Sequence, residues 1–337
     1  MVYNTRDKQL SVKTIAEMAG VSVATVSRVI NQNGRFSAET EKRVKDIIKQ
    51  FDYQPNQLAR GLRVSKTRVI GILVPDITNE FFSRITLKIQ QALYAYNYAT
   101  IVCNTNETAE IEIQHMKMLK SQRVSGLIYI SGGICGDFFY PTVFIDRRPS
   151  NEDLDATCVF IESDNRMGGY IAAKELLKNG CKKIAFIRFK DNISSHEERL
   201  VGYRQAIEEA GMTHDPNLII YAKNVSLEEG AAASDALFSR NPDTDGVFCS
   251  TDLLAVGVIK RLNEKGWNVP RQVKVIGFDN ISIANVIHPS LTTVHQDIDS
   301  FASLSVNALM SMIDGEPVKQ NVYTVPVKLI TRESTRI

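Results

Sequence analysis

From residue 69 onward the sequence alternates short β-rich runs with longer amphipathic segments, and no other feature restricts the possible folds as strongly. The runs with the composition of strands are VIGILVP, ATIVCN, GLIYIS, VFIDR, KIAFI, GVFCS and VKVIGF. Apolar residues recur with helical spacing in the segments 80–97, 107–122, 164–179 and 251–265. Strands that alternate with helices predict parallel sheets with helices on both faces.

The same order of elements restarts near residue 165, in the stretch DNRMGGYIAAKELLKNGCKKIAFI. Two similar α/β lobes are therefore expected, in agreement with a length of 337 residues, which is too great for one small core. No apolar run approaches the roughly 20 residues of a membrane span, and the N-terminal MVYNTRDKQLSVK lacks the apolar core of a secretory signal. These features predict a cytoplasmic protein with no membrane partner.

Cysteine and histidine spacing argues against disulfide and metal chemistry. The cysteines at positions 103, 135, 158, 181 and 249 are widely separated and form no CxxC pair. We expect reduced thiols rather than a disulfide framework or a zinc site. The 5 histidines show no HxxxH spacing, so no metal site is expected.

The formal net charge of +2 conceals two regions of opposite charge. Residues 1–68 contain 13 Lys and Arg but 6 Asp and Glu, a charge of +7, whereas the remainder carries −5. A basic N-terminal region on an acidic body predicts a polyanionic partner for that region alone.

Three helices are expected in the basic region. Ser11 is placed to cap the first helix, which Gly20 ends, and Ser22 caps the second after the short turn GVS. A third helix begins at Ser37. A helix, a glycine-containing turn, a second helix and a supporting helix follow one another in a helix-turn-helix DNA-binding domain.

The second helix, in GVSVATVSRVIN, has an outer face of short and polar residues. Short side chains allow the backbone to approach the major groove, where Arg28 would contact guanine and Val23 or Ala24 a thymine methyl group. The alternative is a structural amphipathic hairpin without a DNA-binding role. The DNA contacts expected in this domain are Lys13, Thr14, Ser22, Val23, Ala24, Thr25, Ser27, Arg28 and Asn31.

The stretches SVKTIAEMAGVSVATVSRVIN and YQPNQLARGL closely resemble the LacI-type (lac and purine repressor) transcription regulators, and the resemblance extends to the C-terminal VKLITRESTR. It implies that residues 56–66 are a hinge helix that folds on DNA, with contacts from Asn56 and Ala59 and with Leu62 wedged into the minor groove. Two hinges side by side require a homodimer on a near-palindromic operator. A plain flexible linker is the alternative for this segment.

The resemblance also implies a domain organisation around a periplasmic-binding-protein-like core. The expected boundaries are 1–55 for the helix-turn-helix domain, 56–66 for the hinge, 67–163 plus 297–327 for the N-terminal lobe, 164–296 for the C-terminal lobe, and 328–337 for a C-terminal tail. The last crossing between the lobes is expected near 291–297.

Polar residues follow several predicted strands, at the edge where open α/β sheets bind ligands. DITNEFF, Asp146-Arg147, Thr251-Asp252 and Asp279-Asn280 occupy such positions, and the resemblance adds Arg199 and Gln296. Aromatic rings stack on the apolar faces of a sugar, while carboxylates and guanidinium groups bind its hydroxyls. The candidate ligand contacts are Asn79, Phe81, Phe82, Asp146, Arg147, Arg199, Thr251, Asp279 and Gln296.

Each of these residues also has a purely structural interpretation. On this interpretation the two phenylalanines are core residues, the aspartates cap the next helix or satisfy loop amides, and Arg199 forms a surface ion pair. TNEFF, IDR, Arg199, Asp279 and Gln296 are similar to the pocket of ribose-type periplasmic binding proteins, whereas Thr251 stands where asparagine is usual. Asp146 and Asp279 balance Arg147 and Arg199, which favours a neutral pentose or hexose, ribose first, over a phosphorylated sugar.

The sequence therefore predicts a dimeric, sugar-responsive repressor of a carbohydrate-utilisation operon, with no cofactor and no catalytic residues. An enzyme is disfavoured because the chain has no GxxxxGK[ST], GxSxG or HExxH motif. A transport-type sugar-binding protein would leave the basic N-terminal region unexplained. A global carbon regulator with a phosphoprotein corepressor and a nucleobase-responsive repressor remain as alternatives.

Overall fold

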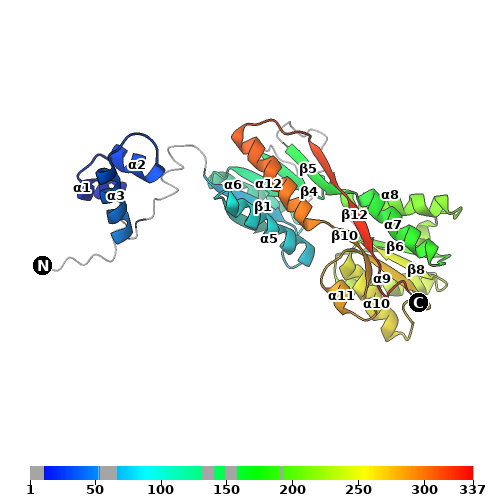
Figure 1. Cartoon of the computed structure of the whole chain (residues 1–337). Helices are drawn as coiled ribbons and strands as arrows, with labels where there is room; N and C mark the ends of the chain where they lie inside the picture. Colours follow the sequence, from blue (N-terminus) through cyan, green and yellow to red (C-terminus); the bar gives the residue numbers. More distant parts are fainter. Residues whose placement is uncertain are drawn as a thin grey trace. The chain divides into compact units, whose positions relative to one another are not determined.

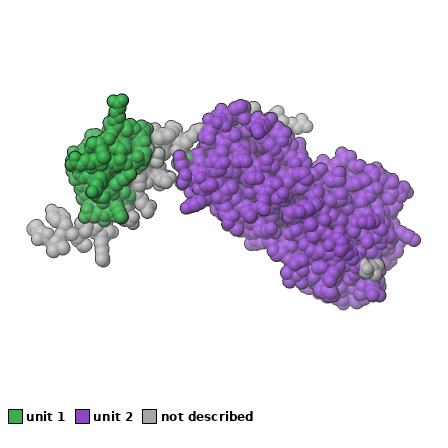
Figure 2. Space-filling view, in the orientation of Figure 1, with its two compact units in different colours: residues 1–67 green, residues 68–337 purple. Residues whose placement is uncertain are grey.

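The computed structural model describes residues 11–51, 53, 67–130, 140–148, 158–189 and 193–336. The chain divides into two compact units, residues 1–67 and 68–337, shown in green and purple in Figure 2. The expected hinge contacts Asn56, Ala59 and Leu62 lie outside the described residues, as does Cys135.

The described part of the first unit contains α1 (Val12–Ala19), α2 (Val23–Asn31) and α3 (Ala38–Gln50). Each helix begins at a serine, Ser11, Ser22 or Ser37, whose hydroxyl accepts a backbone N–H three residues later at 3.1–3.2 Å. Such caps contribute about 1 kcal/mol each. Gly20 ends α1 in the left-handed conformation, with φ 61°, which costs glycine little because it has no Cβ. The expected caps are confirmed.

One small apolar core joins these three helices. Ile15 and Ala19 of α1, Val26 and Val29 of α2 and Val44 of α3 are each at most 1% exposed. The core accounts for the inner face of α2, so the composition of its outer face needs a separate reason.

The second unit contains two six-stranded sheets, with the strand orders β11-β5-β4-β3-β1-β2 and β12-β10-β9-β8-β6-β7. All neighbouring pairs are parallel except β10 and β12. The first sheet is formed by β1 (Val69–Val74), β2 (Ala99–Asn104), β3 (Gly126–Tyr129), β4 (Thr142–Ile145), β5 (Cys158–Ser163) and β11 (Val322–Val325). The second is formed by β6 (Ile184–Phe189), β7 (Ile219–Ala222), β8 (Gly246–Cys249), β9 (Lys274–Asp279), β10 (Thr292–Gln296) and β12 (Val327–Ile330).

Helices cover both faces of each sheet, which confirms the expected fold class (Figure 1). In the first lobe, α5 (Glu80–Ala95) and α12 (Ile298–Asp314) share one apolar core with the sheet, and α6 (Ala109–Ser121) packs on a second core. In the second lobe, α9 (Leu227–Arg240) and α10 (Asp252–Glu264) share one core, and α7 (Asn165–Lys178) and α8 (Ser194–Glu209) the other. The short helices η1 (Pro216–Leu218) and α11 (Ile283–Val286) complete this lobe.

The chain passes between the lobes three times, after β5, after β10 and after β11. The last crossing therefore lies at residues 325–327 rather than near 291–297. The segment 328–337 is not a tail, because β12 pairs with β10 and Ser334 Oγ donates to the Val275 carbonyl at 2.6 Å. The strand completes the sheet by pairing backbone groups that would otherwise lack partners.

Candidate functional sites

The outward face of α2 is small and polar, as the sequence predicted. Ser22, Val23, Ala24 and Arg28 are exposed, and Thr25 and Ser27 are half-buried. In α1, Lys13 is exposed and Thr14 half-buried. The side chain of Asn31 lies outside the described part of the chain. The expected DNA contacts that are described thus lie at or near the surface of the helix-turn-helix.

Lys13 of α1 and Arg28 of α2 are among the cationic side chains that have no carboxylate partner within residues 11–51. The ion pairs in that range, Arg43–Glu39 and Lys45–Glu41, are both on α3. Gly34, with φ 96°, approaches Arg28 so closely that a Cβ there would lie 3.3 Å from Arg28 Cδ. Lys13 and Arg28 are therefore available for phosphate or base contacts.

A cavity of about 390 Å³ is bounded by both lobes, at the carboxyl ends of the two sheets. The first lobe contributes Pro75, Asp76, Asn79, Phe81, Phe82, Asn106, Glu107, Asp146 and Arg147. The second lobe contributes Phe189, Ser195, His196, Arg199, Asn224, Val225, Ser226, Thr251 and Asp279. This is the position at which open α/β folds bind small molecules.

Arg199 connects the two lobes at the floor of this cavity. Its side chain is 2% exposed and lies 3.5 Å from Asp146, measured from Nη2 to Oδ2. Nε donates to Asn165 Oδ1 at 2.8 Å, and Asn165 Nδ2 in turn donates to Asp146 Oδ1 at 3.1 Å. The Arg199 guanidinium also stacks on the Phe278 ring at 3.6 Å. Both charges are thus fixed before any ligand contact is made.

Asp279 supplies a second buried carboxylate, 6% exposed, at the end of β9. Gln296 Nε2 donates to Asp279 Oδ1 at 2.7 Å, and Ser163 Oγ donates to Gln296 Oε1 at 2.6 Å. Burial raises the pKa of Asp279 to about 7, and nearby Arg199 opposes this rise. Burial also raises the pKa of Asp146, again opposed by Arg199. Desolvation disfavours a charged carboxylate, so the ionised forms of Asp146 and Asp279 lower the stability of the folded protein. Buried groups with shifted pKa values are typical of binding sites, and these two are suited to a polar ligand.

The backbone at both aspartates has a positive φ, 58° at Asp146 and 109° at Asp279. Residues other than glycine rarely adopt such angles, and the strain they store concentrates at binding sites. Neither aspartate caps a helix, because their strands β4 and β9 are followed by loops. The helix-cap interpretation of these two residues is therefore wrong.

Arg147 is occupied by a carboxylate of its own. Its Nη1 donates to both oxygens of Glu107, at 2.8 and 2.9 Å, and its guanidinium lies 5.2 Å from the centre of the Phe82 ring. Glu107 follows β2, the strand that pairs with β1 at the edge of the first sheet. At the cavity wall, the Phe82 ring therefore lies beside the Arg147 guanidinium, whose charge Glu107 balances.

Every predicted ligand contact lines the cavity except Gln296, which is 0% exposed and lies behind Asp279. Phe81 and Phe82 also belong to the first-lobe core, and Asn79 and Thr251 also cap α5 and α10, so the two interpretations of these residues coexist. The lining residues that the sequence did not indicate are Pro75, Asn106, Glu107, Phe189, Ser195, His196 and 224–226, and Asn165, the partner of Asp146, was also missed. The strand-end rule, applied also to ATIVCN and KIAFI, would have found Asn106, Glu107 and Phe189.

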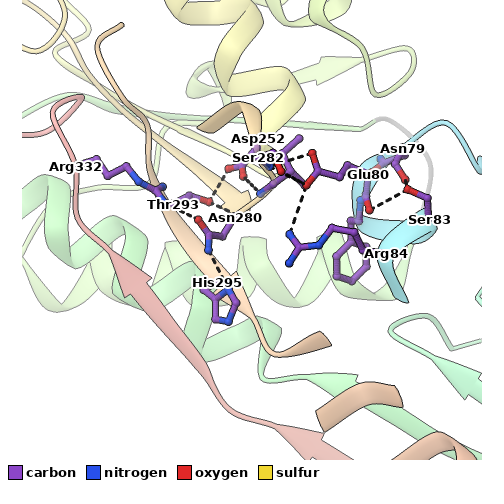
Figure 3. Close-up of polar contacts among 12 residues, drawn as sticks. Asn79, Glu80, Ser83, Arg84, Asp252, Asn280, Ser282, Thr293, His295 and Arg332 are labelled. Atoms are coloured by element: carbon purple, nitrogen blue, oxygen red, sulfur yellow. Dashed lines mark hydrogen bonds and ion pairs between the residues drawn. The ribbon is translucent and has the colours of Figure 1, made fainter. Parts of the chain in front are cut away.

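The lobes contact each other beside the cavity through Glu80 (Figure 3). Its carboxylate accepts the Ser282 N–H at 2.9 and 3.0 Å and the Ser282 hydroxyl at 2.7 Å. Elsewhere, Ser194 Oγ accepts the backbone N–H of Arg148 at 2.8 Å. These hydrogen bonds join the first lobe to the second outside the cavity itself.

The C-terminal segment supports the loop that carries both Asp279 and Ser282. Arg332 Nη2 donates to Asn280 Oδ1 at 2.7 Å, and Asn280 Nδ2 contacts His295 Nδ1 at 3.1 Å. Figure 3 shows these contacts beside the contact between Ser282 and Glu80 of α5. The segment expected to be a tail therefore helps to position the cavity wall.

Two glycines let α7 and α8 approach closely and so place Arg199. A Cβ at Gly169 would lie 2.0 Å from the Arg199 carbonyl oxygen, and one at Gly202 would lie 1.9 Å from that of Arg166. No side chain fits at either position unless the backbone moves. The glycines in DNRMGGY and ERLVGY thus set the depth at which Arg199 enters the cavity.

Two family models match the chain, bacterial regulatory proteins of the lacI family over residues 11–56 and a periplasmic binding protein-like domain over residues 173–335. The ribose operon repressor of Halalkalibacterium halodurans is 33% identical to the chain over 330 residues, which cover 97% of each protein. This chain belongs to the lacI family. A second relative, the HTH-type transcriptional repressor PurR of Vibrio atlanticus, is 32% identical over 335 residues, covering 97% of this chain and 98% of the relative.

A solved structure supports the same assignment for the second unit. The periplasmic binding protein/LacI transcriptional regulator of Alkaliphilus metalliredigens, complexed with D-xylulofuranose, is 28% identical, with a TM-score of 0.71. The match covers 80% of this chain and 99% of that structure. As a member of the lacI family, the chain is a DNA-binding transcription regulator, and its relatives are regulators rather than enzymes. Among its described residues, no helix has the length and apolar character that crossing a membrane requires.

Proposed function

We propose that this protein is a cytoplasmic repressor of a carbohydrate-utilisation operon and that a neutral monosaccharide, with ribose the first candidate, binds between its lobes. One observation carries the proposal: the cavity combines buried carboxylates with aromatic rings from both lobes. Asp146 and Asp279 are each 6% exposed, and Phe82 and Phe189 are 9% and 7% exposed. Carboxylates accept hydrogen bonds from sugar hydroxyls, and aromatic rings cover the apolar faces of a sugar ring.

The charges around the cavity favour a neutral ligand over a phosphorylated one. Its described lining holds the carboxylates of Asp76, Glu107, Asp146 and Asp279 against two guanidinium groups. Glu107 binds one of these groups and Asp146 the other. A phosphate dianion would thus meet a surplus of negative charge in a site of low dielectric constant.

Sugar binding would be coupled to DNA binding through the arrangement of the lobes. A ligand that contacts both lobes stabilises their closed arrangement, and it changes DNA affinity by its differential affinity for the two arrangements. Closure would alter the spacing of the paired hinge segments 56–66. In that segment we propose that Asn56 and Ala59 contact DNA and that Leu62 inserts into the minor groove.

A homodimer on a palindromic operator is the second part of the proposal. Large apolar side chains are exposed around the edge strand β2: Leu87 and Tyr94 on α5, Val102 on β2, and Ile113 and Met118 on α6. Leu87 is 53% exposed and Tyr94 82%. Several exposed large apolar side chains at one edge of a lobe support a subunit contact there. A charged substitution, Leu87→Glu, is expected to yield monomers in sedimentation experiments.

The DNA contacts follow from the exposed face of α2. We propose that Arg28 binds a guanine edge, that Val23 and Ala24 contact a thymine methyl group, and that Lys13 binds phosphate. Thr14, Ser22, Thr25, Ser27 and Asn31 would complete the contacts to bases and backbone.

A nucleobase ligand is the second candidate, favoured by the relative that is named PurR. Calorimetric titration of the full-length protein with D-ribose, D-xylose, D-glucose, ribose 5-phosphate and hypoxanthine separates the candidates. We expect binding of a neutral sugar, weakened by about 2–3 kcal/mol in Asp146→Ala because hydrogen bonds to charged groups are strong. Asp299→Ala, at a position 76% exposed on α12, is the matched control and should bind as the wild type does. Binding of hypoxanthine alone, or of ribose 5-phosphate alone, would contradict the proposed function.

A further inference from the structure

His196 lies in the first turn of α8, where it lines the cavity between the lobes. Its side chain is 4% exposed, and its ring meets the Phe189 ring edge-on at 6.3 Å between centroids. The residue before α8, Ile193, provides no side-chain cap to the helix. Among the described residues, the imidazole packs at the cavity wall against the Phe189 ring.

Within the described part of the chain, one nitrogen of this ring is buried and has no hydrogen-bond partner. Among the residues that the structure describes, no donor or acceptor reaches His196 Nδ1. Buried polar atoms are nearly always paired, because an unpaired one forfeits its hydrogen bonds with water. Because His196 lines the ligand cavity, a bound ligand is the partner that we infer for this ring.

The surroundings also fix the chemical character of the ring. Burial and the neighbouring cations Arg199, Arg147 and Arg188 lower the pKa of His196 well below its ordinary value of 6.5. At neutral pH the ring is uncharged, with one nitrogen as donor and the other as acceptor. A neutral imidazole both donates and accepts, as a sugar hydroxyl does, so the two groups can form a hydrogen bond in either direction.

We propose that His196 is a specificity-determining ligand contact, whose imidazole hydrogen-bonds one particular hydroxyl of the bound sugar. This inference rests on the proposed function, because it assigns one contact within the sugar site. Asp146, Asp279 and Arg199 would hold the sugar in general, whereas His196 would distinguish sugars that differ at a single carbon. A site that hydrogen-bonds a hydroxyl rejects analogues that lack it.

Two substitutions separate a ligand contact from a packing role. His196→Phe keeps a ring beside Phe189 but removes both nitrogens, whereas His196→Asn keeps a polar atom near the position of Nδ1. His288→Phe, at a side chain 91% exposed, is the matched control. Each full-length variant is titrated calorimetrically with D-ribose, D-xylose, D-arabinose and the deoxy analogues of ribose, and its melting temperature is measured without sugar.

For the sugar that the wild type binds best, we expect His196→Phe to lose about 10- to 100-fold in affinity and His196→Asn to lose less. One deoxy analogue should bind the wild type and His196→Phe equally, because the hydroxyl that the ring contacts is already absent. Without sugar, His196→Phe should melt about 2–4 °C higher, since an unpaired buried nitrogen has been removed. Unchanged sugar affinity in His196→Phe, or a lower melting temperature without sugar, would overturn the role of His196. Failure of the wild type to bind any neutral sugar would instead overturn the proposed function.

Discussion

Replacing Asp279 by asparagine is predicted to stabilise the protein at pH 8 while weakening sugar binding. Burial, opposed by Arg199, raises the pKa of this carboxyl from 3.8 to about 7. Between these two pH values the folded protein holds a proton that the unfolded chain has released. The stabilising contribution of the group is therefore fully present below pH 3.8 and is lost as the pH rises to 7.

The size of the effect follows from the difference between the two pKa values. Each pH unit corresponds to about 1.4 kcal/mol, so the ionised carboxylate destabilises the folded state by about 4 kcal/mol at pH 8. Asparagine keeps the oxygen that accepts from Gln296 Nε2 at 2.7 Å and carries no charge. We compare the free energy of unfolding of Asp279→Asn with that of the wild type at each pH. This difference should increase in favour of the variant by about 4 kcal/mol between pH 4 and pH 8.

Urea denaturation followed by tryptophan fluorescence measures this difference in the relevant lobe. The single tryptophan, Trp267, packs on Phe238 in the second lobe, with ring centroids 4.9 Å apart. Asp299→Asn, at an exposed position, serves as the control and should follow the wild-type pH profile. Parallel profiles for Asp279→Asn and the wild type would refute the assignment of Asp279 as a desolvated carboxylate that is retained for ligand binding.

Two further predictions concern DNA contacts and the contact between lobes. Arg28→Ala should lose about 1–3 kcal/mol on the specific operator and relax preference at one base pair, whereas Lys13→Ala should weaken binding to all sequences and reduce its salt dependence. Equal losses on specific and random DNA in fluorescence anisotropy would count against base contact by Arg28. Glu80→Ala removes the acceptor of Ser282 and should lower sugar affinity by about 1 kcal/mol, while Glu110→Ala on α6 should not. Identical calorimetric affinities for these two variants would show that the Glu80 contact does not stabilise the sugar-binding arrangement.

The sequence predicted seven strands, most of them buried, although β2 lies at a sheet edge and is largely half-buried or exposed. The predicted runs correspond to β1 to β4, β6, β8 and β9, where β-branched and aromatic residues form continuous apolar stretches. β10 has the sequence TTVHQ and was missed because its buried side chains are mostly polar. Thr292, Thr293 and Gln296 are buried through hydrogen bonds to distant residues. Such partners are set by tertiary structure and leave no periodic pattern.

The cavity residues that directly follow strands could be predicted from the sequence. Asp146 and Asp279 directly follow apolar runs, so their neighbourhood could be inferred from parallel topology. Asn165 and His196 lie instead in the first turns of α7 and α8. Their approach to the cavity depends on the close helix contact at Gly169, which no local sequence rule describes.

The central claim is that a neutral sugar in the cavity controls DNA affinity. The most direct measurement is fluorescence anisotropy of the full-length protein on DNA from upstream of its own gene, with and without saturating D-ribose or whichever neutral sugar calorimetry identifies. We predict that the sugar changes the DNA dissociation constant by about tenfold or more, and that Asp279→Ala binds DNA without sugar but loses the response. An unchanged dissociation constant while the sugar occupies the cavity, or a response that persists in Asp279→Ala, would contradict the account.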